Sequence, residues 1–204
     1  MILTSSTFIA QGNPELQDRF DVIDFDTSRA LVVADGVGGR SGAAEAAEFV
    51  IRTTRAVSNR LSDGASCVNL LREMDQRLAG AQDGGETTAV IVIVGSNKIY
   101  GANVGDSTAW FFAQSGSEEL TRARKPYLGT GAALPHKFEH TLIEGTIVVA
   151  SDGLWKYTDL KLITEKVRTE EPKKLAVALG DLVRLRSSAF QDDIAVVTCH
   201  IRSS

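Results

Sequence analysis

Residues 88–113 read TAVIVIVGSNKIYGANVGDSTAWFFA, three apolar runs separated by short turns. The runs Thr88–Val94, Lys98–Val104 and Thr108–Ala113 have the length and the β-branched or aromatic content of strands. Gly95-Ser96-Asn97 has the length of a hairpin loop. Strands joined by such short turns are expected to be antiparallel, because a parallel connection needs a crossover of about a dozen residues or more. The stretch therefore predicts antiparallel sheet and argues against a doubly wound parallel fold.

Helices and further strands are expected on both sides of this stretch. Apolar residues recur at helical spacing in two Ala-rich or Leu-rich segments before it, and Pro172 suits the first position of a later helix. The expected helices are Gly42–Leu61, Ser66–Ala81, about Leu154–Thr169 and Pro172–Ser188, and the further strands are Arg29–Ala34, Thr141–Ala150 and Ile194–Ile201. This order predicts an α+β fold, a sheet sandwich flanked by helices, in one domain over residues 1–204.

The composition fits an ordinary globular chain and excludes several classes of protein. The 204 residues include 22 Lys and Arg against 26 Asp and Glu, a formal net charge of −4, and 43% are hydrophobic. That balance argues against a disordered or fibrous chain, and the lack of a basic stretch argues against nucleic acid or an anionic membrane as partner. No apolar run approaches the roughly 20 residues that span a bilayer, and Met1–Ser6 lacks a signal-peptide pattern, so a cytoplasmic location is expected.

Cysteine and histidine offer little chemistry in this sequence. Cys67 and Cys199 lie far apart without metal-ligand spacing, so they are expected to be buried thiols in a reducing cytosol. His136 and His140 lie four residues apart in a segment that looks like a loop leading into a strand, and His200 has no second motif near it. A histidine metal site is therefore disfavoured.

Aspartates stand at the ends of four apolar strands. Asp35, Asp106 and Asp152 follow strands, and Asp192 precedes one. A single Asp-Gly after a strand is most simply a turn, because Asp bonds to its own backbone and Gly tolerates a positive φ. Antiparallel packing, however, can bring Asp35, Asp152 and Asp192 to one edge, where crowded carboxylates repel unless cations lie among them. Oxygen ligands without His or Cys select Mg²⁺ or Mn²⁺.

A competing interpretation concerns residues 22–27, which read VIDFDT. They resemble the acidic Asp-x-Asp-x-Thr box of haloacid-dehalogenase-type phosphohydrolases, in which the first Asp is the nucleophile. Here the next strand begins within two residues, which fits a hairpin and leaves no crossover helix. The sequence therefore disfavours that class.

Taken in order, the motifs resemble those of the metal-dependent protein phosphatases, the type 2C serine/threonine phosphatase family. The matched pieces run along the whole chain in the family's order: Gln17-Asp18, Val33–Gly39, Glu86–Ala89, Asn103–Ser107, Ser151–Trp155 and Asp192–Val196. The resemblance implies the family's four-layer α-β-β-α sandwich, two antiparallel sheets flanked by helix pairs, and this agrees with the expected order of elements.

The resemblance also implies a centre of two Mn²⁺ or Mg²⁺ ions. By motif position, Asp35 bridges the ions, and the carbonyl of Gly36 completes one shell. Asp152 and Asp192 hold the other ion, and Asp18 acts through metal-bound water. A hydroxide formed between the ions then attacks phosphorus in line with the leaving alkoxide, so Asp35 and Asp152 have the catalytic role. Asp106 matches the position that, with the equivalent of Asp152, holds a third, weaker metal.

Several positions depart from the family pattern. Asn13 stands where the family commonly has an Arg that binds the substrate phosphate. Arg19 and Arg40 are the candidates to replace it, although each is more simply a surface charge. Val37 occupies the place of a His in some members, and Glu86 replaces a Gly. These changes affect the expected phosphate binding and leave the implied metal ligands intact.

The expected function is hydrolysis of phosphoserine and phosphothreonine on proteins, opposing a Ser/Thr kinase, by a monomer with no nucleic-acid or membrane partner. The segment Leu120–Gly145 is short, with room only for a loop where the family carries a mobile flap. The main alternative is a pseudophosphatase that binds a phosphoprotein without turnover, and a small-molecule phosphoesterase is a further one. The missing Arg favours the pseudophosphatase, and the full set of aspartates disfavours it, because a binding module gains nothing from crowded carboxylates.

Overall fold

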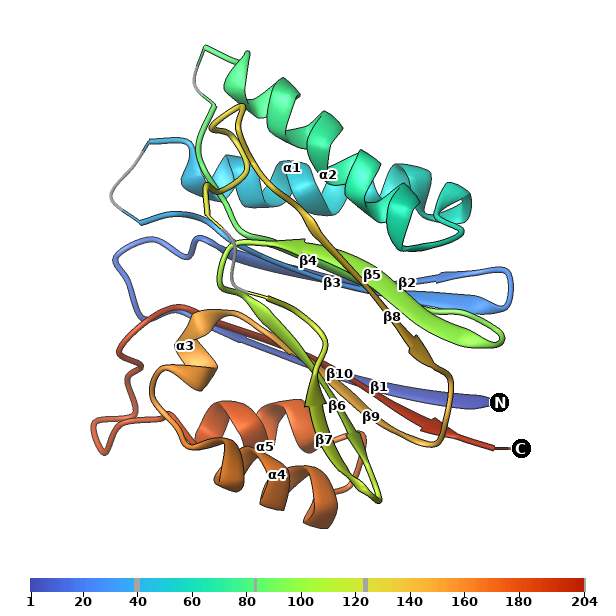
Figure 1. Cartoon of the computed structure of the whole chain (residues 1–204). Helices are drawn as coiled ribbons and strands as arrows, with labels where there is room; N and C mark the ends of the chain where they lie inside the picture. The colour runs from blue at the N-terminus through green and yellow to red at the C-terminus, as the bar shows by residue number, and fades with distance from the viewer. Residues whose placement is uncertain (39–40, 83, 123–124, 204) are drawn as a thin grey trace.

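Two five-stranded sheets lie face to face in the computed structural model, which describes residues 1–38, 41–82, 84–122 and 125–203 (Figure 1). Neighbouring strands within each sheet are antiparallel. The first sheet has the order β2 (Asp18–Phe25), β3 (Ser28–Asp35), β4 (Ala89–Val94), β5 (Lys98–Val104) and β8 (His136–Thr141). The second sheet has the order β1 (Ile2–Ala10), β10 (Ile194–Arg202), β9 (Gly145–Ala150), β6 (Thr108–Ala113) and β7 (Gly116–Glu119).

Helices cover the outer face of each sheet. α1 (Ala43–Val57), the 3-10 turn η1 (Ser58–Arg60) and α2 (Gly64–Ala79) lie on the first sheet, and α4 (Leu160–Thr169) and α5 (Leu175–Asp181) lie on the second (Figure 1). α3 (Asp152–Trp155) is a single turn directly after β9. The predicted α+β sandwich of four layers is confirmed. Within the described ranges, no helix is both long and apolar enough to cross a membrane.

The side chains of the inner strands alternate between two apolar cores. On β3, Ala30 and Val32 face the α1 and α2 layer, whereas Leu31 and Val33 face the second sheet, and all four are fully buried. Both faces of this strand are therefore apolar, which explains its continuous hydrophobic run. Each fully buried Val or Leu side chain contributes roughly 1.5–3 kcal/mol to stability.

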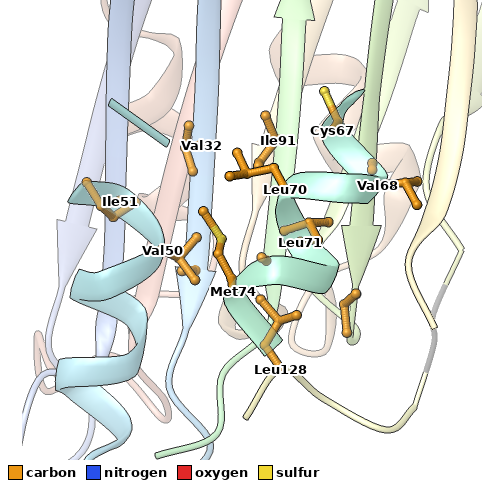
Figure 2. Close-up of a cluster of buried hydrophobic side chains, with 14 of the residues drawn as sticks. Val32, Val50, Ile51, Cys67, Val68, Leu70, Leu71, Met74, Ile91 and Leu128 are labelled. Carbon is orange, nitrogen blue, oxygen red and sulfur yellow. The ribbon is translucent and has the colours of Figure 1, made fainter. Parts of the chain in front are cut away.

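Helices α1 and α2 dock on the first sheet through the apolar stripes seen in the sequence. Figure 2 shows Val50 from α1 and Leu71 and Met74 from α2 gathered over Val32 and Ile91 of the sheet. α2 begins with a capping box, in which the Asp63 side chain accepts from the Ser66 backbone N–H at 2.7 Å. The helical prediction for both segments is confirmed.

One prediction about strand pairing is wrong. The hairpin at residues 95–97 is present and closes with a bond from the Gly95 N–H to the Lys98 carbonyl. The turn at residues 105–107, however, carries the chain from β5 in the first sheet to β6 in the second, and the two strands do not pair. Gly105 has φ +89°, and a Cβ there would meet the Thr88 side chain at 2.6 Å, so the sharp change of sheet requires glycine.

Several boundaries also differ from the sequence prediction, and the strand expected over Thr141–Ala150 begins only at Gly145. Residues 136–141 form the edge strand β8 rather than a loop, so Leu120–Gly145 holds more than a loop. The helix expected over Leu154–Thr169 is split, because Asp159 caps a new helix through a bond from the Lys161 N–H at 2.8 Å. α5 is shorter than Pro172–Ser188.

Residues 22–27 run from β2 into the β2–β3 turn, so they form the predicted hairpin and not a dehalogenase-type box. Cys67 and Cys199 are buried free thiols, as predicted. His200 Nδ1 lies 3.0 Å from the Thr146 hydroxyl, and His140 packs on the Phe111 ring.

Candidate metal centre

A polar cavity of about 300 Å³ opens where the ends of both sheets meet. It lies at the start of β10, whereas both chain termini lie at the far end of the β1–β10 pair (Figure 1). The cavity is lined by five carboxylates and by smaller or polar residues: Asp35, Asp106, Asp152, Asp192 and Asp193, with Asn13, Gln17, Gly36, Val37, Gly38, Thr88, Tyr127 and Lys156. The structure therefore brings the four strand-end aspartates to one place.

Asp35 ends β3 and is held by the Thr87-Thr88 pair. The Asp35 N–H donates to the Thr88 hydroxyl at 3.0 Å, and its carbonyl accepts from the Thr88 N–H at 2.8 Å and from the Thr87 hydroxyl at 2.9 Å. The next residue is held as well, since the Gly36 N–H donates to the Gln17 carbonyl at 3.3 Å. This network explains why the Thr-Thr motif accompanies the Asp-Gly motif.

Asp152 and Asp106 are joined by the short helix α3. Asp152 is the first residue of α3, and a Cβ on Gly153 would lie 1.9 Å from the Asp193 carbonyl oxygen. Glycine at position 153 therefore lets the segment that carries Asp152 approach the segment that carries Asp193. The Trp155 indole N–H donates to the Asp106 carbonyl at 3.1 Å, which ties the end of α3 to the turn between the sheets.

Asp192 and Asp193 are neighbours with different tasks. Asp193 is 4% exposed, and its carboxylate accepts the backbone N–H groups of Gly12 at 2.9 Å, Asn13 at 3.0 Å and Gln17 at 2.7 Å. Asp193 thus holds the loop that follows β1 against the site. Asp192 accepts from the Asn13 side chain at 2.7 Å and stays part-exposed at the cavity.

Asp18 is buried beside Asp35 and is not among the residues that line the cavity. It is the Cα partner of Asp35 in the β2–β3 pair and is 1% exposed. Its Oδ2 atom is one of the buried side-chain atoms, among the described residues, with no hydrogen-bond partner. A buried carboxylate oxygen without a partner is costly, and a cation or an ordered water would satisfy it.

The carboxylates perturb one another. Burial raises the pKa of Asp18 to about 7, and the charges of Asp193 and Asp152 act in the same direction. Burial also raises the pKa of Asp35 well above its ordinary value, helped by the charges of Asp18 and Asp152. The pKa of Asp152 is raised by burial as well, although its contact with Lys156 opposes the shift. The site therefore resists ionisation unless positive charge is supplied.

The donor set fits a hard divalent cation. Carboxylate oxygens of Asp35, Asp106 and Asp152 lie within 4.8 Å of one another, so one ion can contact all three. Oxygen ligands alone favour Mg²⁺ or Mn²⁺ over Zn²⁺. The Asp18 oxygen that lacks a hydrogen-bond partner also favours a bound cation, and so do the raised pKa values of Asp18 and Asp35.

Of the two arginines that the sequence offers as candidate phosphate ligands, Arg19 binds other partners outside the cavity lining. The Arg19 guanidinium donates to the carbonyls of Leu16 and Asp18 at 2.9 and 2.8 Å and pairs with Glu48 at 3.2 Å. It is not among the residues that line the cavity. Arg40 lies outside the described residues.

Sequence reasoning missed two residues of the cavity wall. Lys156 contacts the Asp152 carboxylate from four residues on, a spacing that fits one helix face. Tyr127 reaches the cavity because Asp75, on α2, accepts the backbone N–H groups of Gly129 at 2.8 Å and Ala133 at 3.0 Å and thereby holds the segment that follows it. No local motif marks Tyr127.

Two antiparallel sheets between helix layers, with aspartates at one shared end, define the fold class of the type 2C phosphatases. A family profile described as Stage II sporulation protein E (SpoIIE) matches residues 26–202, and the chain belongs to this family. The family and fold predicted from the motifs are thereby confirmed. A comparison with curated protein sequences finds no match.

Solved structures share the fold at low sequence identity. The serine/threonine phosphatase PstP/Ppp of Mycobacterium tuberculosis superimposes with a TM-score of 0.85 at 17% identity, over 100% of both chains. The serine/threonine phosphatase of S. agalactiae gives a TM-score of 0.86 at 17% identity, over 98% of this chain and 100% of the other. The catalytic domain of PstP in complex with two manganese ions gives 0.83 at 19% identity, over 98% and 99%.

Proposed function

We propose that the protein hydrolyses phosphoserine and phosphothreonine in proteins with the help of two Mn²⁺ or Mg²⁺ ions. The observation that carries this proposal is the meeting of the Asp35, Asp106 and Asp152 carboxylates within 4.8 Å beside an open cavity. The manganese-bound PstP domain, which has the same fold, supports the choice of ions. The names of the PstP and S. agalactiae proteins support the choice of substrate.

The residues that would hold the two ions are Asp35, Gly36, Asp152 and Asp192, with Asp18 buried beside Asp35 and Asp106 at a third, weaker site. Divalent ions bound there lower the pKa of a coordinated water and offset charge on phosphoryl oxygens. The chain's own part is to hold the carboxylates rigidly, through the Thr87-Thr88 and Asp193 networks described above.

A cysteine or histidine nucleophile from the described residues is not supported. Cys67 and Cys199 are buried in the apolar cores, and burial raises the pKa of Cys67 to about 12, so its thiolate is scarce at neutral pH. Within the described residues, the cavity wall holds no Cys or His. Hydrolysis by activated water agrees with these observations.

We further propose that residues 1–204 work as one catalytic domain, as a monomer in the cytoplasm opposing a Ser/Thr kinase. The cavity takes Asp35 from the first sheet and Asp192 from the segment before β10 of the second, so both halves of the sandwich are needed. The volume of about 300 Å³ leaves room for a phosphorylated side chain.

The test is phosphate release from a phosphothreonine peptide. We expect release with Mn²⁺, none with EDTA, and loss of release in Asp152→Asn. Asp181→Asn is the matched control, since its half-exposed carboxylate pairs with Arg184 on the surface of the protein. Release that survives EDTA and Asp152→Asn would overturn the proposal, and tight peptide binding without turnover would favour the binding-module alternative.

A further inference from the structure

Lys156 brings a positive charge into the acidic cavity. It follows α3, its backbone N–H donates to the Asp152 carbonyl at 3.0 Å, and its ammonium contacts Asp152 Oδ2. The side chain is 43% exposed, so it is neither buried nor fixed by packing. A lysine of this kind can exchange one acceptor for another at little cost, because its stem is flexible.

Lys156 has no competitor as the cation of this site within the described residues. The described lining holds five carboxylates and the single ammonium of Lys156. Arg19 is taken up by two backbone carbonyls and by Glu48. Asn13 carries no charge, and its side-chain amide already donates to Asp192.

Asp152 cannot serve Lys156 and a divalent ion equally well. The Lys156 ammonium and a divalent ion compete for the same carboxylate. The divalent ion is the stronger partner for a hard oxygen ligand. The Lys156 ammonium, which is part-exposed at the cavity, is then left to water or to another acceptor that enters the cavity. A phosphate dianion is the natural acceptor, because ammonium–phosphate hydrogen bonds are charge-assisted and an acidic wall offers a phosphate few other donors.

We propose that Lys156 binds the phosphoryl group of the substrate, the role for which the sequence offered Arg19 or Arg40. The inference rests on the proposed function, since it assumes that the cavity receives a phosphomonoester. It assigns to Lys156 the binding of ground-state phosphate, so its main effect falls on KM and on the affinity for the product phosphate.

The experiment compares wild type with Lys156→Gln, Lys156→Arg and Lys173→Gln. Lys173 is an exposed lysine outside the cavity and serves as the matched control. Inorganic phosphate is titrated into the Mg²⁺-loaded proteins by calorimetry, and Mn²⁺ binding is followed through the signal of free Mn²⁺ in electron paramagnetic resonance. Steady-state kinetics on a phosphothreonine peptide separate KM from kcat.

We expect Lys156→Gln to weaken phosphate binding about tenfold and to raise KM by a similar factor, while Lys156→Arg keeps most of the affinity. Mn²⁺ affinity should stay equal or rise in Lys156→Gln, because the ammonium no longer competes for Asp152. Unchanged phosphate affinity in Lys156→Gln overturns the inference. So does a loss of Mn²⁺ binding in that variant, since Lys156 would then act only by holding Asp152.

The two proposals fail in different ways. A wild-type protein that neither releases nor binds phosphate overturns the proposed function and the inference together. A wild-type protein that hydrolyses the peptide, with Lys156→Gln indistinguishable from it, overturns the role of Lys156 alone.

Discussion

Asp18 and Asp35 lie directly opposite each other in the antiparallel pair of β2 and β3. Asp18 is 1% exposed, and its Oδ2 has no hydrogen-bond partner in the part of the chain that the structure describes. The charge of Asp18 adds to burial in raising the pKa of Asp35. Two carboxyl groups that face each other in this way destabilise the metal-free fold once both are ionised, which is a common cost of a binding site.

Replacing Asp35 by Asn should separate stability from activity. The amide cannot ionise, so it removes the repulsion with Asp18 and raises the free energy of unfolding of the metal-free protein at pH 7.5 by about 1–2 kcal/mol. Metal-dependent phosphate release should fall at least about a hundredfold, since a ligand is lost. Urea unfolding and phosphate release measure the two effects. Asp26→Asn, at the exposed β2–β3 turn with φ 48°, is the control and should change neither.

The metal-free protein should lose stability as the pH rises from about 4 to about 7. Asp18 has a folded pKa of about 7 against an ordinary 3.8, so the folded state binds its proton more tightly over that interval. The melting temperature in EDTA should be roughly 5–10 °C lower at pH 7.5 than at pH 5. Mn²⁺ should reverse the loss at pH 7.5. An equal loss in Asp18→Asn would show that other groups cause it.

Asp193→Asn should loosen the loop at residues 12–17. The carboxylate accepts three backbone N–H groups. In Asn, an NH₂ group replaces one of the oxygens, and it cannot accept a hydrogen bond from the backbone N–H that it meets. We expect a loss of roughly 1–3 kcal/mol in the free energy of unfolding. Hydrogen exchange of residues 12–17 should become faster than in wild type. Exchange that stays at the wild-type rate would mean that the loop is held by other contacts.

Gly153→Ala should displace α3 from β10. The added Cβ would lie 1.9 Å from the Asp193 carbonyl oxygen. Only a movement of the backbone can relieve this clash. We expect a stability loss of about 2 kcal/mol or more and weaker Mn²⁺ binding, because Asp152 moves with the helix. The control is Gly38→Ala, whose Cβ would meet the Gln17 side chain at an ordinary 3.6 Å and should leave the melting temperature near that of wild type.

The strand-end aspartates show how far sequence reasoning reaches in this protein. Asp35, Asp106 and Asp152 were predictable, because an apolar run that stops at an Asp is a local pattern. Their meeting within 4.8 Å depends on the register Asp18↔Asp35 and on the change of sheet at residues 105–107, and the latter contradicted the expected pairing. The ligand roles of these aspartates remain predictions.

Side-chain chemistry does not distinguish Asp192 from Asp193, and only the motif resemblance singled out Asp192 in advance. Both carboxylates line the cavity, but Asp193 accepts the backbone N–H groups of Gly12, Asn13 and Gln17, whereas Asp192 accepts only the Asn13 side chain from that loop within the described residues. Lys156 reads as one more surface charge until α3 places it beside Asp152. Tyr127 reaches the cavity wall through contacts between α2 and a segment more than fifty residues away in the chain.

The sequence by itself determined the type and order of most elements, the apolar faces of the inner strands and the acidic chemistry of the site. These properties follow from side-chain alternation, helical spacing and turn residues within a few positions of each other. Only the tertiary structure decided which sheet each strand joins and which carboxylates are desolvated. It also decided that the Lys156 ammonium lies in the cavity with them. Those outcomes depend on burial and on contacts between distant segments, because desolvation and charge repulsion act through space and not along the chain.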